Sequence, residues 1–169
     1  MYFIISFTGP DVHLICGLTA AGVVNITLRR GSFTAAAAKE WMKDVLDRWV
    51  EIGNDLQDLL VVCDNAPCHS RLNEVFADSP AMLLKLGPYS PMLNPVESIW
   101  SKVKAHVKST IRVPVVEGPA VGEQRIAYLE NAIRNATAAI TNGDCARAVQ
   151  HASSFYVNVL GLHDMHPGT

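Results

Sequence analysis

The sequence predicts an α/β domain with a mixed sheet, antiparallel in its first strands and extended by parallel ones, with helices on both faces and extra C-terminal helices. Short apolar and β-branched runs separated by turn residues open the chain, which is typical of antiparallel strands. Strand-like runs then alternate with helical patterns, which is typical of parallel additions to a sheet. From about residue 121 onward, only helical periodicity is found.

The composition fits a single folded domain. The chain has 169 residues, of which 49% are hydrophobic and 18% charged, and this argues against disorder. The formal net charge is −2, so the molecule as a whole has no basic field that would attract nucleic acid. The distribution is uneven, however, because the stretch 98–112 carries basic residues and no acid, whereas 40–58 is rich in acids.

The sequence gives no sign of a membrane segment or an exported protein. No apolar stretch approaches the roughly 18 residues of a membrane span, and the first residues lack the basic region of a signal peptide. The four cysteines form no CxxC pair. Reduced thiols in an intracellular protein are the favoured interpretation, although the even number leaves disulfides open.

Three strands and a helix are predicted in the first part of the chain. Tyr2–Phe7 is apolar and ends before Gly9-Pro10, and the runs 13–19 and 23–28 form a hairpin around Ala20-Ala21-Gly22. From residue 34 to about 50, apolar residues recur every three or four positions, which predicts an amphipathic helix capped by Ser32 or Thr34.

Two further strands and a helix follow. Leu59–Cys63 is continuously apolar, as in a strand covered on both faces. A short helix is predicted over 71–77 and a strand over 82–86. Asn94 is a good N-cap and Pro95 suits the first helical position, so a helix is expected from Pro95 to about Ser109.

The C-terminal part is expected to be helical. Every third or fourth residue is apolar from Ile126 to Ile140; Asn142-Gly143 is expected to break this helix, and 145–160 carries a second, weaker stripe. The stretch 113–121 (VPVVEGPAV) is a plausible hinge. We therefore divide the chain into a core, residues 1–112, and a C-terminal helical extension, residues 113–169.

Two carboxylates stand where a metal site for phosphodiester chemistry is expected. Asp64 directly follows a buried strand, and Glu97 lies on the first turn of the next long helix. Cleavage of phosphodiesters uses two divalent metals about 3.5–4 Å apart, and magnesium prefers hard oxygen ligands on rigid elements. Glu97 shares one helical stripe with Lys104 and Lys108, which suits a groove that holds a phosphate backbone.

Simpler roles remain open for each residue. Glu97 is also at the position of a capping-box glutamate, and Asp64-Asn65 can shape a turn through their side chains. His69 alone is more often a loop or satisfied core histidine than a ligand. A histidine and cysteine metal site made of Cys145, His151, His163 and His166 has poor spacing.

Two motifs together resemble mariner-type DDE transposases. The first is Asp64-Asn65-Ala66-Pro67-x-His69 after the apolar strand. The second is Pro-Tyr-Ser-Pro-x-Leu-Asn-Pro-x-Glu-x-x-Trp-x-x-x-Lys, which begins at Pro88 and includes Glu97, Trp100 and Lys104. The second motif is long and specific, and the resemblance covers roughly residues 12 to 110.

The resemblance implies a ribonuclease-H-like fold, a three-carboxylate Mg²⁺ or Mn²⁺ site, and DNA cleavage and strand transfer during transposition. Asp64 and Glu97 are then the second and third acids, both catalytic and metal-binding, with Asn65, His69 and Trp100 in supporting positions. Lys102, Lys104, Lys108 and Arg112 are the candidate DNA-binding residues. A homodimer is possible, and a nuclear location is implied only by the resemblance.

The first acid of the family is missing from its expected strand. Residues 1–10 contain no Asp or Glu, and Asp11 lies in a Gly-Pro-Asp turn. The N-terminal DNA-recognition modules of the family are also not found, so we expect a chain that has lost its front part. Two functions therefore stay open: a transposase-type domain with weak metal binding and impaired cleavage, or a non-catalytic DNA-binding or dimerising remnant.

Overall fold

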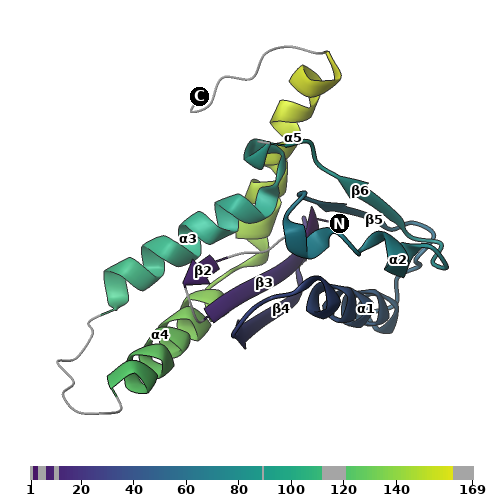
Figure 1. Ribbon diagram of the computed structural model, residues 1–169. Helices are drawn as coiled ribbons and strands as arrows, with labels where there is room; N and C mark the ends of the chain where they lie inside the picture. Colours follow the sequence, from purple (N-terminus) through teal and green to yellow (C-terminus); the bar gives the residue numbers. More distant parts are fainter. Residues whose placement is uncertain (1, 4–6, 10–11, 89, 112–120, 162–169) are drawn as a thin grey trace.

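The computed structural model describes residues 2–3, 7–9, 12–88, 90–111 and 121–161 (Figure 1). The described strands are β1 (Tyr2–Phe3), β2 (Phe7–Gly9), β3 (Val12–Thr19), β4 (Gly22–Arg30), β5 (Leu60–Cys63) and β6 (Met82–Lys85). The helices are α1 (Ala35–Glu51), α2 (Asn73–Phe76), α3 (Pro95–Thr110), α4 (Val121–Ala138) and α5 (Asn142–Leu160), with 3-10 turns η1 (Pro67–His69) and η2 (Pro91–Leu93). None of these described helices is both long and apolar enough to cross a membrane.

The strands form one mixed sheet. β3 pairs antiparallel with β4 on one side and with both β1 and β2 on the other. β1 also pairs parallel with β5, and β5 pairs parallel with β6 in a register that places Cys63 beside Lys85. The predicted α/β class with antiparallel first strands and parallel additions is confirmed, and it brings the end of β5 to one edge of the sheet.

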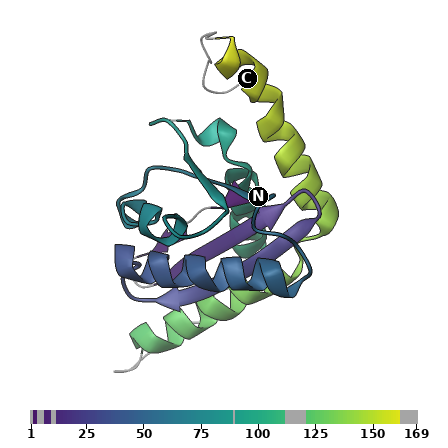
Figure 2. The same cartoon turned by 90° about the vertical axis from the view of Figure 1, so that its right-hand side faces the viewer.

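Alternating side chains on β3 divide the core into two layers. Ile15 packs with α1 on one face, whereas Leu14 and Cys16 pack with α3, α4 and α5 on the other. This is the period of two expected when helices cover both faces of a sheet. Figure 2 shows α1 crossing one face, with the C-terminal helices behind the sheet.

The helix α1 forms as its pattern predicts. Thr34 accepts a hydrogen bond from the amide of Ala37 at 3.3 Å, which caps the first turn. Trp41 and Met42 belong to its buried face, and the Trp41 indole donates to Thr27 Oγ of β4 at 3.0 Å. The helix is thus attached to the sheet by apolar burial and by one satisfied polar contact.

The opposite layer is built from three helices. The predicted apolar stripe of α3, formed by Val96, Ile99, Val103 and Val107, is buried. The stripe of α4 from Ile126 to Ala136 packs in the same cluster, as do Ile140 in the link after α4 and Cys145 and Ala148 of α5. The C-terminal helices therefore share a core with β3, and the division at residues 112 and 113 stays a prediction.

One expectation is corrected, and several others fall outside the described residues. Asn142-Gly143 does not break the helix: α4 ends at Ala138, and α5 begins at Asn142, with Thr141 as its N-cap in a capping box with Asp144. The prediction was wrong because a Thr with an acid three residues later outweighs a generic Asn-Gly turn signal. The centre of the Tyr2–Phe7 strand, Asp11, Arg112 and residues 113–120 of the predicted hinge lie outside the described residues.

We predict that Ile133→Ala destabilises the whole domain. Ile133 is fully buried between α4 and the sheet layer, so its truncation should lower the free energy of unfolding by about 2–5 kcal/mol. Trp41, Trp49 and Trp100 all lie outside α4 and α5, and urea unfolding followed by their fluorescence should show the full loss.

Leu160→Ala is the control, because Leu160 is 85% exposed and its change should fall within about 0.5 kcal/mol. An Ile133→Ala variant with an unchanged fluorescence transition would mean that the C-terminal helices unfold independently of the sheet.

Candidate active site

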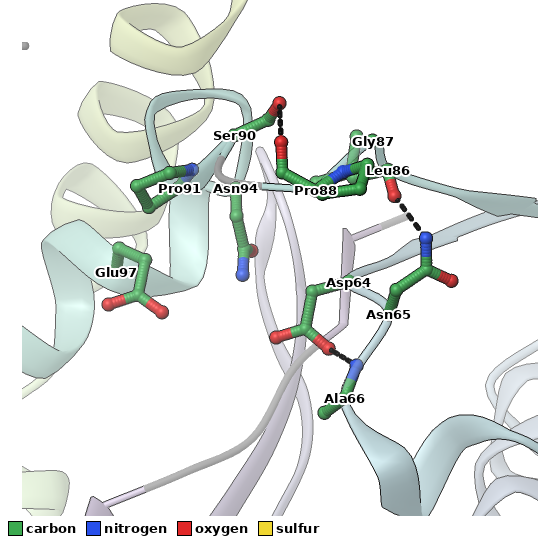
Figure 3. Close-up of a pocket in the computed structure, with 10 residues that line it drawn as sticks. All are labelled: Asp64, Asn65, Ala66, Leu86, Gly87, Pro88, Ser90, Pro91, Asn94 and Glu97. Carbon is green, nitrogen blue, oxygen red and sulfur yellow. Dashed lines mark hydrogen bonds between the residues drawn. The ribbon is translucent and has the colours of Figure 1, made fainter.

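Asp64 lies at the carboxyl end of β5, where the polypeptide leaves the sheet. Its Oδ1 accepts a hydrogen bond from the amide of Ala66 at 2.9 Å and lies 2.7 Å from Nδ1 of His69. Both contacts involve the same oxygen, and the side chain is 35% exposed. The other carboxylate oxygen is therefore directed toward solvent and the neighbouring pocket (Figure 3).

His69 is a buried partner of Asp64. The residue is 1% exposed, and its Nδ1 also lies 3.2 Å from the carbonyl oxygen of Asp64. Burial lowers the pKa of His69, but the Asp64 carboxylate and the Cys68 side chain raise it, and the net result is a pKa of about 9. The imidazole is thus protonated at neutral pH and holds one oxygen of Asp64 by a charge-assisted hydrogen bond.

Glu97 is fixed by the start of α3. Asn94 caps this helix, with its side-chain oxygen accepting from the amide of Val96 at 3.3 Å. A capping-box glutamate would bind the backbone amide of Asn94, but that amide donates to the carbonyl of Pro91 at 3.0 Å. The simple capping role for Glu97 is therefore not observed, and its side chain lines a pocket instead.

The two carboxylates face the same pocket, which has a volume of about 450 Å³. Figure 3 shows the side chains of Asp64 and Glu97 directed into one space, with the Asn94 amide between their two elements. The rim is completed by Ala66 and by the segment after β6, comprising Leu86, Gly87, Pro88, Ser90 and Pro91. Asn65 donates from Nδ2 to the carbonyl of Leu86 at 2.8 Å, which ties the ends of β5 and β6 together.

Electrostatics also links the two acids. Burial raises the pKa of Glu97, the ammonium group of Lys104 lowers it, and the negative charge of Asp64 raises it, with a net upward shift. A like charge has this effect only when it is near. The pocket therefore brings two carboxylates together whose charge Lys104 and His69 offset only in part, and a cation would stabilise it.

The donor set fits a hard divalent cation. Two carboxylates on a strand end and a helix offer oxygen ligands of the kind that Mg²⁺ and Mn²⁺ accept, with water able to complete the coordination. Among the described residues, no cluster of three or more His, Cys, Asp or Glu side chains is arranged to hold a metal. Asp64 and Glu97 are thus the two carboxylates that line the pocket. The described residues supply no third carboxylate to this metal site.

The predicted basic residues do not form one patch. Lys104 and Lys108 are exposed on the same side of α3 as Glu97. Lys102 points elsewhere, because its ammonium pairs with Asp144 of α5. Arg112 lies outside the described residues. The predicted DNA-binding role of these residues stays a prediction, and Lys102 belongs to a different surface from the other two.

The remaining predicted residues divide between scaffold and pocket. Trp100 is 1% exposed and packs in the core under α3, so it supports the helix and does not reach the pocket. Of the residues in the alternative histidine and cysteine site, Cys145 is buried and His151 is exposed, while His163 and His166 lie outside the described residues.

Sequence reasoning missed two features of this site. Asn94 was expected only as a helix cap, yet it also lines the pocket. The contact of His69 with Asp64 was not foreseen, although their spacing of five residues across a Pro-containing turn was a usable signal.

These features define a class: a mixed sheet covered by helices, with acidic residues converging at one edge from a strand end and a helix start. The model of the DDE superfamily endonuclease family matches residues 8–118. The chain belongs to the DDE superfamily endonuclease family. No curated protein matches the chain in a sequence comparison.

Several solved structures with the same fold are of mariner transposase. The catalytic domain of Mos1 mariner transposase is 13% identical, with a TM-score of 0.67, and the match covers 98% of this chain and 83% of that one. A structure of that catalytic domain with raltegravir and Mn is 14% identical, with a TM-score of 0.68 and coverage of 97% and 81%. The predicted DDE family is confirmed by the family model, and the predicted likeness to mariner transposase is confirmed in fold.

A third structure, the Mos1 mariner paired-end complex with Mn, is 16% identical with a TM-score of 0.64. The match covers 89% of this chain but 43% of the longer transposase chain.

We predict that the contact between His69 and Asp64 stabilises the fold at neutral pH and is lost in alkali. The folded pKa of about 9 lies above the ordinary value of 6.5, so the stabilisation is complete below about pH 6.5 and disappears as the pH rises through about 9. Urea unfolding of the wild type should therefore show a decline in this window that His69→Gln lacks.

Thiol ionisation also affects stability in alkali, because burial raises the pKa of Cys16 and Cys63 to about 12. This contribution is common to both proteins, so the difference between wild type and His69→Gln isolates the histidine. Parallel pH profiles of the two proteins would contradict the assignment.

Proposed function

We propose that this domain is a ribonuclease-H-like, transposase-type domain that binds DNA and acts on its phosphodiesters at Asp64 and Glu97. The observation that carries the proposal is that both carboxylates face one solvent-open pocket. Membership of the DDE superfamily endonuclease family supports the same chemistry. Mg²⁺ or Mn²⁺ is the implied cofactor, and a Mn-containing structure of mariner transposase supports this choice for a relative.

Each residue of the site has a distinct task in this proposal. Asp64 presents one oxygen to the pocket because Ala66 and His69 hold the other. Glu97 approaches from a helix that is anchored by its buried stripe. A bound divalent metal would activate the attacking oxygen and stabilise the leaving one. Lys104 and Lys108 would contact the phosphates of the DNA strand.

We infer that cleavage by this polypeptide is impaired. The family site uses three acids, and no Asp or Glu occurs in residues 1–10, where the first strand begins. With two carboxylates, less charge is available to hold a divalent ion, and metal binding should be weak. A weakly held ion leaves the attacking and leaving oxygens without their main electrostatic support.

The second candidate is a non-catalytic DNA-binding or dimerising remnant of a transposase. The same lack of a third acid at the pocket, among the residues that the structure describes, favours it. DNA is the partner in both proposals, and the paired-end complexes with a transposon end are DNA complexes of a relative. A homodimer and a nuclear location remain part of the proposal.

A nicking assay separates the two functions. Supercoiled plasmid incubated with Mn²⁺ should be nicked slowly by the wild type, and Asp64→Asn and Glu97→Gln should both reduce nicking to the level of buffer alone. Gel electrophoresis of the relaxed circle measures the rate. Plasmid binding without nicking at any Mn²⁺ concentration would favour the remnant, and nicking that survives both changes would exclude these residues as the site.

We also predict that Mn²⁺ stabilises the folded protein through the same residues. A ligand that binds only the folded state raises its stability as its concentration exceeds Kd. Thermal unfolding should therefore shift upward with Mn²⁺, more so at higher pH, because the raised pKa of Glu97 means that protons compete with the metal.

Asp64→Asn and Glu97→Gln should lose the Mn²⁺-dependent shift. Glu123→Gln on α4 removes the same charge from an exposed site and should retain it. An equal shift in all four proteins would show that the metal binds elsewhere.

A further inference from the structure

A second polar pocket lies between α3 and α5, on the side of α3 that faces away from Glu97. It has a volume of about 270 Å³ and is lined by Ser98, Ile99, Lys102, Asp144, Arg147, Ala148 and His151. α3 and α5 pack against each other along this line (Figure 1). The pocket presents a hydroxyl, two cationic side chains and an imidazole, with a single acid among them.

The acid in this pocket organises the cations. One oxygen of Asp144 pairs with the ammonium of Lys102, and the other accepts from Arg147 at 2.7 Å. Asp144 also closes the capping box with Thr141 and is only 10% exposed. The Lys102 ion pair, followed by the contacts with Thr141 and Arg147, holds the pKa of Asp144 well below its usual range, so it stays ionised and fixes both cations in place.

The cations retain capacity for an anionic ligand. The Lys102 and Arg147 side chains are 44% and 72% exposed. A guanidinium has five N–H donors and an ammonium has three, so each can donate to an anion while contacting Asp144. The two positive charges of Lys102 and Arg147 against the one negative charge of Asp144 leave the pocket cationic.

Aromatic side chains continue the same line along α5. Arg147, His151 and Phe155 are spaced by four residues, so they lie on one face of the helix. The His151 and Phe155 rings are 5.1 Å apart between centroids and meet edge to face at 89°. His151 is exposed and Phe155 is half-buried, so an imidazole ring stands beside the cations where a sugar or base of a bound strand could contact it.

The two pockets approach each other at the first turn of α3. Ser98 directly follows Glu97 on the first turn of α3 and lies about 100° around the helix from it. At the other end, Phe155 packs near Leu93 of η2, and the neighbours Pro91 and Asn94 line the active-site pocket. A strand that leaves the carboxylates can therefore pass over the first turn of α3 to reach Lys102 and Arg147.

The charge distribution favours DNA on this side of the molecule. α3 carries three lysines and one acid, whereas α1 on the opposite face carries four acids and three bases. The net charge of the chain is −2, so it does not attract a polyanion. The difference in charge between the two faces guides an approaching polyanion instead.

We propose that the pocket between α3 and α5 is a second DNA contact site, in which Lys102 and Arg147 bind the phosphate backbone and His151 contacts the adjacent sugar or base. The inference rests on the proposed function, because it takes DNA as the ligand, but it does not require cleavage. The competing interpretation is that the ion pairs only join α3 to α5.

Binding without metal tests the proposal. The probe is a short fluorescein-labelled DNA duplex of random sequence, titrated with the full chain in EDTA at several salt concentrations and followed by fluorescence anisotropy. Arg147→Gln and Lys102→Gln should each weaken binding several-fold and lower the slope of log K against log salt by about 0.9 per phosphate contact. His151→Ala should weaken binding with no change in that slope.

Arg48→Gln is the matched control. Arg48 also forms an ion pair three residues away on a helix, with Glu51 at 3.1 Å, but it lies on α1 across the sheet. Its loss should leave DNA binding unchanged. Arg147→Lys keeps the charge and should restore most of the affinity and the salt slope, which a purely structural loss in Arg147→Gln would not explain.

Two outcomes would overturn the proposal: DNA affinity and salt slope equal to wild type in Arg147→Gln and Lys102→Gln, or losses equal to those of Arg48→Gln. Failure of the catalytic proposal gives a different result. In that case Asp64→Asn and Glu97→Gln do not reduce nicking below the level of the wild type. Binding of DNA in EDTA still depends on Lys102 and Arg147.

Discussion

The parallel pairing of β5 with β6 is the constraint on which the candidate site depends. Both strands end at the same edge, with Cys63 beside Lys85, so the polypeptide leaves the sheet twice at neighbouring points. Asp64 is at the first exit, and the Pro-rich segment that leads to α3 is at the second. The hydrogen bond from Asn65 to Leu86 joins the two exits, and Asn94 then starts a helix whose first turn returns Glu97 to Asp64.

The charges of this site are balanced unevenly. Asp64 has a buried cationic partner in His69, whereas Glu97 has burial and a like charge that both raise its pKa, opposed by Lys104. Such an arrangement is costly for an empty pocket, since two acids share a partly dry space. It is favourable once a cation is present, which is the usual reason for acids to be brought together on rigid elements.

Most elements of the fold and both carboxylates could be predicted from the sequence, because each has a strong local signal. The periods of two and 3.6 give the strands and long helices, and Asn94-Pro95 gives the start of α3 within one residue. The contact between His69 and Asp64 depends on a 3-10 turn that burial stabilises, and no periodicity indicates it. Two local signals compete before α5: the Asn142-Gly143 turn signal and the capping box of Thr141 with Asp144. The capping box determines where α5 begins.

Lys102 shows the limit of reading charge along a sequence. It was grouped with Lys104 and Lys108 because all three lie within seven residues, yet it lies about 140° around α3 from Glu97 whereas Lys104 lies about 20° away. Its partner Asp144 is far along the chain and meets it only because α5 packs on α3. α3 has the acid pocket on one side and the cationic pocket on the other, so in the proposed function it is the element that would position a DNA strand at both.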